Sequence, residues 1–260
     1  MWKKIFFCVL NDSFFRMIVD VSIYHSSSDN LNRLLDTQAV SLGFEYIFSN
    51  LLLTTKSQDM ESQISTFITK TRSRTGSLPL QSRQRDTLCV FARVTLALQH
   101  GDRVSVLKDS LLPKLRAVDE IECLCIRPAT EAQFFDLLAV PDLYDMLSID
   151  LSQGSIFQNT YQTVKTVKAQ EDVVIEIEVS STLRGSTELM NLITGARHVL
   201  AKTGGVLVSS GAKNAFEMKS PLDLVNWGEG ILKLRGCKAV VNRILEKTKR
   251  RRIMISNLVR

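Results

Sequence analysis

The alternation of strand-like and helix-like apolar segments most constrains the fold of this 260-residue chain. Residues 18–23 alternate apolar and polar side chains at a period of two, and apolar residues in 31–42 then recur at helical spacing up to Gly43. About seven strands are expected on this pattern. The strands are predicted at 18–23, 44–48, 88–98, 121–126, 146–151, 173–179 and 206–208. Strands that alternate with helices favour parallel βα units.

The segments between these strands have the length and periodicity of helices. Helices are predicted at 31–42, 60–68, 104–115, 130–138, 186–202, 221–232 and 237–247. No G-x-G-x-x-G follows any strand, which argues against an open, doubly wound dinucleotide-binding sheet. A single α/β barrel commonly has this chain length. We therefore predict a TIM-like (β/α) barrel, with functional groups at the carboxyl ends of its strands.

The net charge of +6 is unevenly distributed, because residues 233–260 contain ten Lys or Arg against one acid, Glu246. Such a segment indicates polyanion binding or nuclear import, and a solvated, disordered end is the alternative. We predict an extension outside the fold at 1–16, a barrel domain at 17–247 and a basic tail at 248–260. A second basic patch is predicted to lie in a loop and consists of Lys70, Arg72, Arg74, Arg83 and Arg85.

Polar residues at or near the predicted strand ends are the candidates for chemistry. They are Asp20, Asn50, Arg93, Glu176, Glu178, Ser209, Ser210, Lys213 and Asn214. The three histidines, His25, His100 and His198, have neither H-x-H nor H-E-x-x-H spacing, so we predict no metal site and no cofactor. The sequence marks no base beside Ser209 or Ser210, so no catalytic residue is predicted. Glu176 and Glu178 share one strand face, either for function or facing solvent or an arginine partner.

Residues 206–228 combine a short strand, a loop of small and hydroxylated residues, and a helix start. Ser220 is the predicted N-cap, with Pro221 at the first helical position and Asp223 at the third. Backbone N–H groups of the loop could bind a phosphate, aided by Lys213 and Lys219. The alternative is a strand-to-helix connection without a ligand.

The same segment, VLVSSGAKNAFEMKSPLDLVNWG, resembles the signature of the thirty-kilodalton protein subunit of nuclear RNase P and RNase MRP, a family shared with archaeal RNase P. Its strand ends in Ser-Ser-[Gly/Ala]-Ala and precedes an apolar-Glu-x-[Arg/Lys]-x-Pro-x-Asp-x-x-Asn-x-Gly run. The matching positions are Ser209, Ser210, Gly211, Ala212, Phe216, Glu217, Met218, Lys219, Pro221, Asp223, Asn226 and Gly228. Further similarities lie at 18–21, 42–50, 91–95 and 242–243, so the resemblance spans 17–249.

The resemblance implies a TIM-like barrel related to metallophosphoesterase barrels but lacking their metal site. It implies a non-catalytic, RNA-binding subunit that supports removal of tRNA 5′ leaders by a catalytic RNA, with rRNA processing as a further role. The implied partners are RNase P or MRP RNA, precursor tRNA, a small ferredoxin-like subunit and other RNase P proteins, with no membrane. The implied location is the nucleus and nucleolus. A barrel metallophosphoesterase or a phosphate-binding enzyme remains the alternative.

Taken with the basic segments, the resemblance predicts which side chains bind RNA or phosphate. These are Arg93, Ser209, Ser210, Lys213, Asn214, Lys219, Arg243, Lys249, Arg250, Arg251 and Arg252. Three further polar residues are predicted to line the barrel mouth, namely Asp20, Asn50 and Glu176.

Overall fold

A computed structural model of the protein describes residues 19–74, 88–151, 157, 165–167, 173–180, 185–198, 200 and 205–258. The predicted extension at 1–16 lies outside these residues, as do Arg83 and Arg85 of the second basic patch. Within the described part of the chain, no helix is long and apolar enough to cross a membrane.

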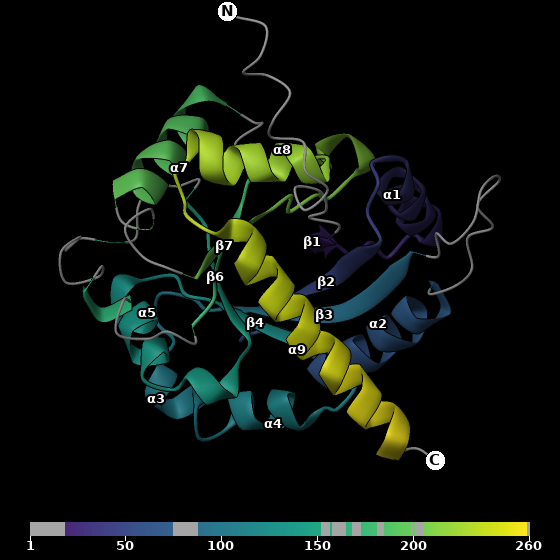
Figure 1. Ribbon diagram of the computed structural model, residues 1–260. Coiled ribbons are helices and arrows are strands. Elements are labelled where there is room, and N and C mark those ends of the chain that lie inside the picture. The colour runs from purple at the N-terminus through teal and green to yellow at the C-terminus, as the bar shows by residue number, and fades with distance from the viewer. Residues whose placement is uncertain are drawn as a thin grey trace, which may run out of the picture.

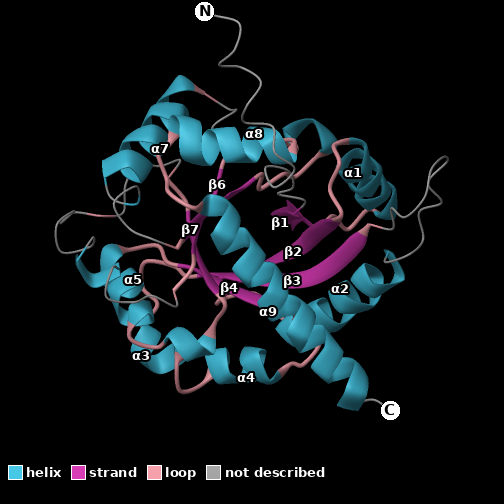
Figure 2. Ribbon diagram, in the orientation of Figure 1, coloured by secondary structure: helices cyan, strands magenta, loops and turns pink. Residues whose placement is uncertain are grey.

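Parallel strands form a barrel surrounded by helices (Figures 1 and 2), which confirms the predicted TIM-like architecture. The described strands are β1 Val19–Tyr24, β2 Tyr46–Thr54, β3 Cys89–Ala97, β4 Cys123–Arg127, β5 Met146–Ile149, β6 Ile175–Glu178 and β7 Val206–Ser209. Each strand pairs in parallel with the next strand in the sequence. A parallel bridge between Ile23 and Ala212 brings β1 against the chain that follows β7 and closes the circle.

Most predicted helices are present, with shifted ends. They are α1 Asp29–Ser41, α2 Met60–Arg74, α3 Val104–Leu107, α4 Leu111–Ala117, α5 Glu131–Leu138, α7 Ser186–His198, α8 Pro221–Val225 and α9 Cys237–Leu258. The single helix predicted at 104–115 is instead two short helices, because Pro113 lacks the N–H that a continuous helix would use. Further short helices are η1 Pro141–Leu143, η4 Ala215–Glu217 and η5 Asn226–Ile231.

The second basic patch is partly helical, which corrects its prediction as a loop. Lys70, Arg72 and Arg74 lie in the last turns of α2. The guanidinium of Arg74 donates to Asp36 on α1 through Nε at 2.9 Å and to Ser49 through Nη1 at 2.8 Å. These bonds hold the end of α2 against its neighbours, so the helix continues six residues beyond the prediction at 68.

Helix α9 crosses the amino ends of the strands diagonally (Figure 1) and includes residues 248–258, which were predicted as a separate tail. The Lys249 ammonium lies 4.3 Å from the centroid of the Tyr46 ring at the start of β2. The Arg252 guanidinium lies 4.2 Å from the Phe91 ring and donates to the carbonyl of Val90 at 2.7 Å. Much of the basic run is therefore packed against the barrel as its amino-terminal cover.

Candidate functional site

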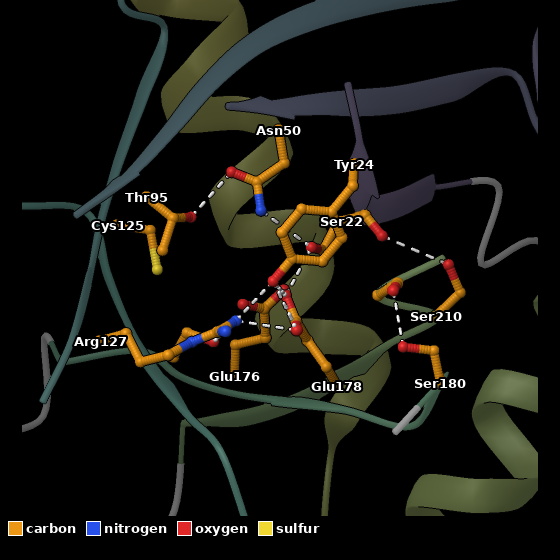
Figure 3. Close-up of polar contacts among 12 residues, drawn as sticks. Ser22, Tyr24, Asn50, Thr95, Cys125, Arg127, Glu176, Glu178, Ser180 and Ser210 are labelled. Atoms are coloured by element: carbon orange, nitrogen blue, oxygen red, sulfur yellow. Dashed lines mark hydrogen bonds and ion pairs between the residues drawn. The ribbon is translucent and has the colours of Figure 1, made fainter. Parts of the chain in front are cut away.

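The barrel interior contains a hydrogen-bonded polar network (Figure 3) in place of the branched aliphatic residues that usually fill such barrels. Arg93 and Glu176 form a two-pronged ion pair, with Nη1–Oε1 and Nη2–Oε2 distances of 2.6 and 2.5 Å. Arg93 Nε donates to Thr95 Oγ1 at 3.1 Å, and that hydroxyl donates to Asn50 Oδ1 at 2.8 Å. Asn50 in turn donates to Ser22 Oγ at 3.2 Å. These bonds connect four strands through their inward side chains.

The carboxyl-terminal mouth of the barrel is organised around Glu178, the last residue of β6 (Figure 3). Its carboxylate accepts hydrogen bonds from Ser22 Oγ at 2.7 Å and Tyr24 Oη at 2.9 Å, and pairs with Arg127 Nη2 at 2.8 Å. Arg127 also donates to Ser148 Oγ at 3.1 Å. Burial alone would raise the pKa of Glu178, but the Arg127 and Arg93 guanidinium groups hold that pKa below its ordinary value. The group is thus an ionised, fully engaged carboxylate.

Asp20 lies at the barrel seam, where β1 meets the chain that follows β7 and the barrel closes. Its Oδ1 accepts from the backbone N–H groups of Ser22 at 3.2 Å and Ser210 at 3.1 Å, which joins β1 to the chain after β7. Its Oδ2 is buried and has no hydrogen-bond partner among the described residues. Burial raises the pKa of Asp20 from 3.8 to about 7.

The structure buries two sets of predicted site residues. Arg93, Ser209 and Ser210 were predicted to contact RNA, but all three are 0% exposed. The same holds for the three residues predicted to line the barrel mouth, Asp20, Asn50 and Glu176. Because side chains alternate between the two faces of a strand, such polar residues can point into the closed barrel. Most of them have hydrogen-bond partners there, but the Ser209 hydroxyl has none among the described residues.

The loop after β7 presents Lys213 to solvent, with its ammonium 5.4 Å from the centroid of the Tyr24 ring. Asn214 Oδ1 accepts from two backbone N–H groups of η4, and Ser220 and Asp223 form the predicted capping box of α8. These backbone donors therefore have acceptors within the loop itself. Lys219 is partly exposed, and phosphate binding by Lys213, Asn214 and Lys219 stays a prediction.

The remaining predicted contacts lie on α9, beside the amino-terminal mouth. Lys249 pairs with Glu246 at 3.4 Å, while Arg252 pairs with Glu122 just before β4. Arg251 lies 3.7 Å from Asp145. A groove of about 660 Å³ follows this helix. Its lining residues are Arg116, Glu122, Asp145, Arg243, Glu246, Lys247, Arg250 and Arg251.

Sequence reasoning missed Arg127 and Tyr24 at one mouth and Arg116 and Asp145 at the other. A signal for Arg127 exists, since it follows the inward-facing Cys125 by two residues and so shares its strand face. Among the described residues, no group of three His, Cys, Asp or Glu side chains could hold a metal ion.

Comparisons with known proteins agree with the resemblance found in the sequence. Residues 17–253 match the family described as RNase P subunit p30. The chain is 29% identical over 140 residues to the probable ribonuclease P protein subunit 3 of Schizosaccharomyces pombe. That alignment covers 53% of this chain and 55% of the relative, so the chain spans about half the length of the curated relative it matches.

A chain in the cryo-EM structure of archaeal ribonuclease P with mature tRNA has the same fold. The two chains superpose with a TM-score of 0.60 at 15% identity, over 92% of this chain and 93% of the archaeal one. Because the family match covers nearly the whole described barrel, from β1 into α9, this chain belongs to the RNase P subunit p30 family.

Proposed function

We propose that this protein is a non-catalytic protein subunit of ribonuclease P that supports 5′-leader removal from precursor tRNA by the RNA component. The observation that carries the proposal is the state of the acids inside the barrel. Glu176 is bound by Arg93, and Glu178 by Arg127, Tyr24 and Ser22. Barrel enzymes act at the carboxyl ends of their strands, and here Glu176 and Glu178 near those ends are already paired with arginines. Such an interior suits a scaffold.

Family membership supports the finer parts of the proposal. The protein binds RNase P RNA mainly through phosphate contacts of exposed Lys and Arg, and meets precursor tRNA within the assembled particle. It functions in the nucleus and nucleolus, beside a small ferredoxin-like subunit and other RNase P proteins. A share of the protein serves RNase MRP in rRNA processing.

The experiment is affinity purification of the tagged, full-length protein from native extract, followed by RNA sequencing, protein identification and a precursor-tRNA cleavage assay. We expect the purified particle to contain RNase P RNA and to release the 5′ leader, and RNase treatment of the particle to abolish cleavage. Recovery of neither the RNA nor the activity would contradict the proposal. Recovery of MRP RNA in the same purification tests the role in RNase MRP, and staining of the nucleolus tests the location.

A variant of the carboxyl-terminal mouth tests whether the barrel takes part in the chemistry. Tyr24→Phe removes one hydroxyl that donates to Glu178 and leaves the aromatic ring in place. If the barrel is a scaffold, particles carrying this variant should cleave precursor tRNA with an unchanged kcat. A large loss of kcat in a particle that still assembles, or phosphodiesterase activity of the purified protein with divalent metals, would instead favour an enzyme.

A further inference from the structure

The groove beside α9 lies at the amino-terminal mouth, the end of the barrel opposite the one that barrel enzymes use for catalysis. Residues of two helices, α4 and α9, line it. Arg116 on α4 accepts a hydrogen bond through its carbonyl from Arg251 Nη2 on α9 at 3.1 Å, which joins the two helices. Glu122 and Asp145, which precede β4 and β5, also line it.

The groove carries more cations than its own acids can neutralise. Asp145 is shared by three cations: Arg116 at 2.8 Å, Lys247 at 2.9 Å and Arg251 at 3.7 Å. Burial alone would raise the pKa of Asp145, yet Lys247 and Arg116 hold it below its ordinary value. Glu122 forms an ion pair with Arg252, which does not itself line the groove. A surplus of positive charge therefore faces the groove.

Arg251 adds to this surplus of positive charge. Its Nη1 atom is buried and lies 3.7 Å from Asp145 Oδ2, beyond hydrogen-bond distance, with no closer acceptor among the residues that the structure describes. An unsatisfied buried donor is unfavourable, and more so for a charged group. Burial and the charge of Arg116 also lower the pKa of Arg251, as expected where cations crowd without enough counter-charge.

We propose that this groove binds the phosphodiester backbone of RNA. The inference rests on the proposed function and adds the place where RNA is held, on the amino-terminal mouth. Four of the five lining cations are arginines, whose planar fork matches phosphate geometry. The volume of about 660 Å³ exceeds what one small anion needs, which favours successive phosphates of a chain.

The test compares two double variants that each remove two positive charges. Lys247→Gln with Arg250→Gln alters the groove, where Asp145 keeps Arg116 as its partner. Arg33→Gln with Arg72→Gln is the control, because both residues are exposed on α1 and α2, away from the groove. Thermal melts establish that both variants fold. RNA affinity of the purified full-length proteins is then measured against salt concentration, with transcribed RNase P RNA as the probe.

We expect the groove variant to lower the slope of log K against log salt by about 1.4 to 1.8, since each lost phosphate contact contributes about 0.7 to 0.9. Its affinity at 0.1 M salt should fall by roughly tenfold or more, and the control should stay within about twofold of wild type. Glu246→Gln should change RNA affinity in the opposite direction. This exposed acid lines the groove, so its removal should strengthen RNA binding by roughly threefold.

The outcomes separate this inference from the proposed function. If the groove variant and its control have equal salt slopes while both assemble into active ribonuclease P, the groove inference is wrong and the proposed function stands. If wild type binds no RNase P RNA and assembles with none, both fail. If polyglutamate binding, and not RNA binding, is weakened by the groove variant, an acidic protein is the ligand and the RNA assignment is overturned.

Discussion

The Arg93–Glu176 pair gives the sharpest prediction about how the barrel is held together. Both side chains are 0% exposed, and they are joined by two hydrogen bonds of 2.6 and 2.5 Å. Arg93→Met keeps much of the side-chain volume but leaves the Glu176 carboxylate buried without its counter-charge. The variant should fold, with a large loss of stability.

The size of the loss follows from the cost of an uncompensated charge in the interior. Removing one partner of a buried ion pair typically destabilises a protein by about 3–5 kcal/mol. For a domain of this size that corresponds to a decrease in Tm of roughly 10 °C. Replacing both partners by apolar residues removes both desolvation penalties. Arg93→Met with Glu176→Met should therefore lose far less than the sum of the single variants.

The assay is a double-mutant cycle by urea unfolding at pH 7, monitored by circular dichroism. Arg33→Met on the exposed face of α1 is the matched control, and we expect it to change the free energy of unfolding by less than about 0.5 kcal/mol.

Two results would refute this account of the interior. One is a loss below about 1 kcal/mol for Arg93→Met, which would mean that the charge of Glu176 is satisfied in another way. The other is strict additivity of the two single variants, which would show that the pair is not energetically coupled. Either result would also weaken the inference that Glu176 is held by Arg93 and unavailable for chemistry.

Two further predictions concern the barrel seam. The pKa of Asp20, raised from 3.8 to about 7, means that its contribution to stability is present at low pH and is lost as pH rises toward 7. The free energy of unfolding of Asp20→Asn, measured with urea relative to wild type, should thus rise by up to roughly 4 kcal/mol between pH 4 and pH 8. A difference between variant and wild type that stays constant with pH would contradict this. Gly211→Ala should cost about 1–3 kcal/mol, because φ is +60° and the new Cβ would lie 2.7 Å from Glu178 Cβ. Gly230→Ala, with open space around its Cβ, is the control and should cost less than 1 kcal/mol by the same measurement.

Local sequence pattern was sufficient to locate the strands and the helix start at Ser220, because both depend on neighbouring residues, although β2 extends six residues beyond its predicted end at 48. Alternation placed β3 within one residue at each end, and the Ser-Pro-x-Asp pattern gave the capping box that the structure contains. The same alternation placed Glu176 and Glu178 on one face. It left open whether that face met solvent or an arginine, since the choice depends on barrel closure.

The inner network required contacts that no local pattern encodes. Glu176 lies 83 positions from Arg93, and Ser22 lies 156 positions from Glu178. Polar residues near strand ends were therefore predicted to line a mouth, whereas closure brought them together one layer deeper. A polar residue at a strand end is thus ambiguous until the partner strand is known.

The basic segment shows the same limit with a functional consequence. Its positive charge is evident in the sequence, but Arg252 contacts Glu122 and Val90, which lie 130 and 162 positions away. Packing divides the run in two. Arg252 anchors α9 to the barrel, while Lys247 and Arg250 remain on the groove that faces solvent. Arg252→Gln should accordingly reduce stability more than RNA affinity. The groove variant should reduce RNA affinity more than stability. Parallel unfolding and RNA-binding measurements on the two variants check this division, and equal effects of both variants on both quantities would contradict it.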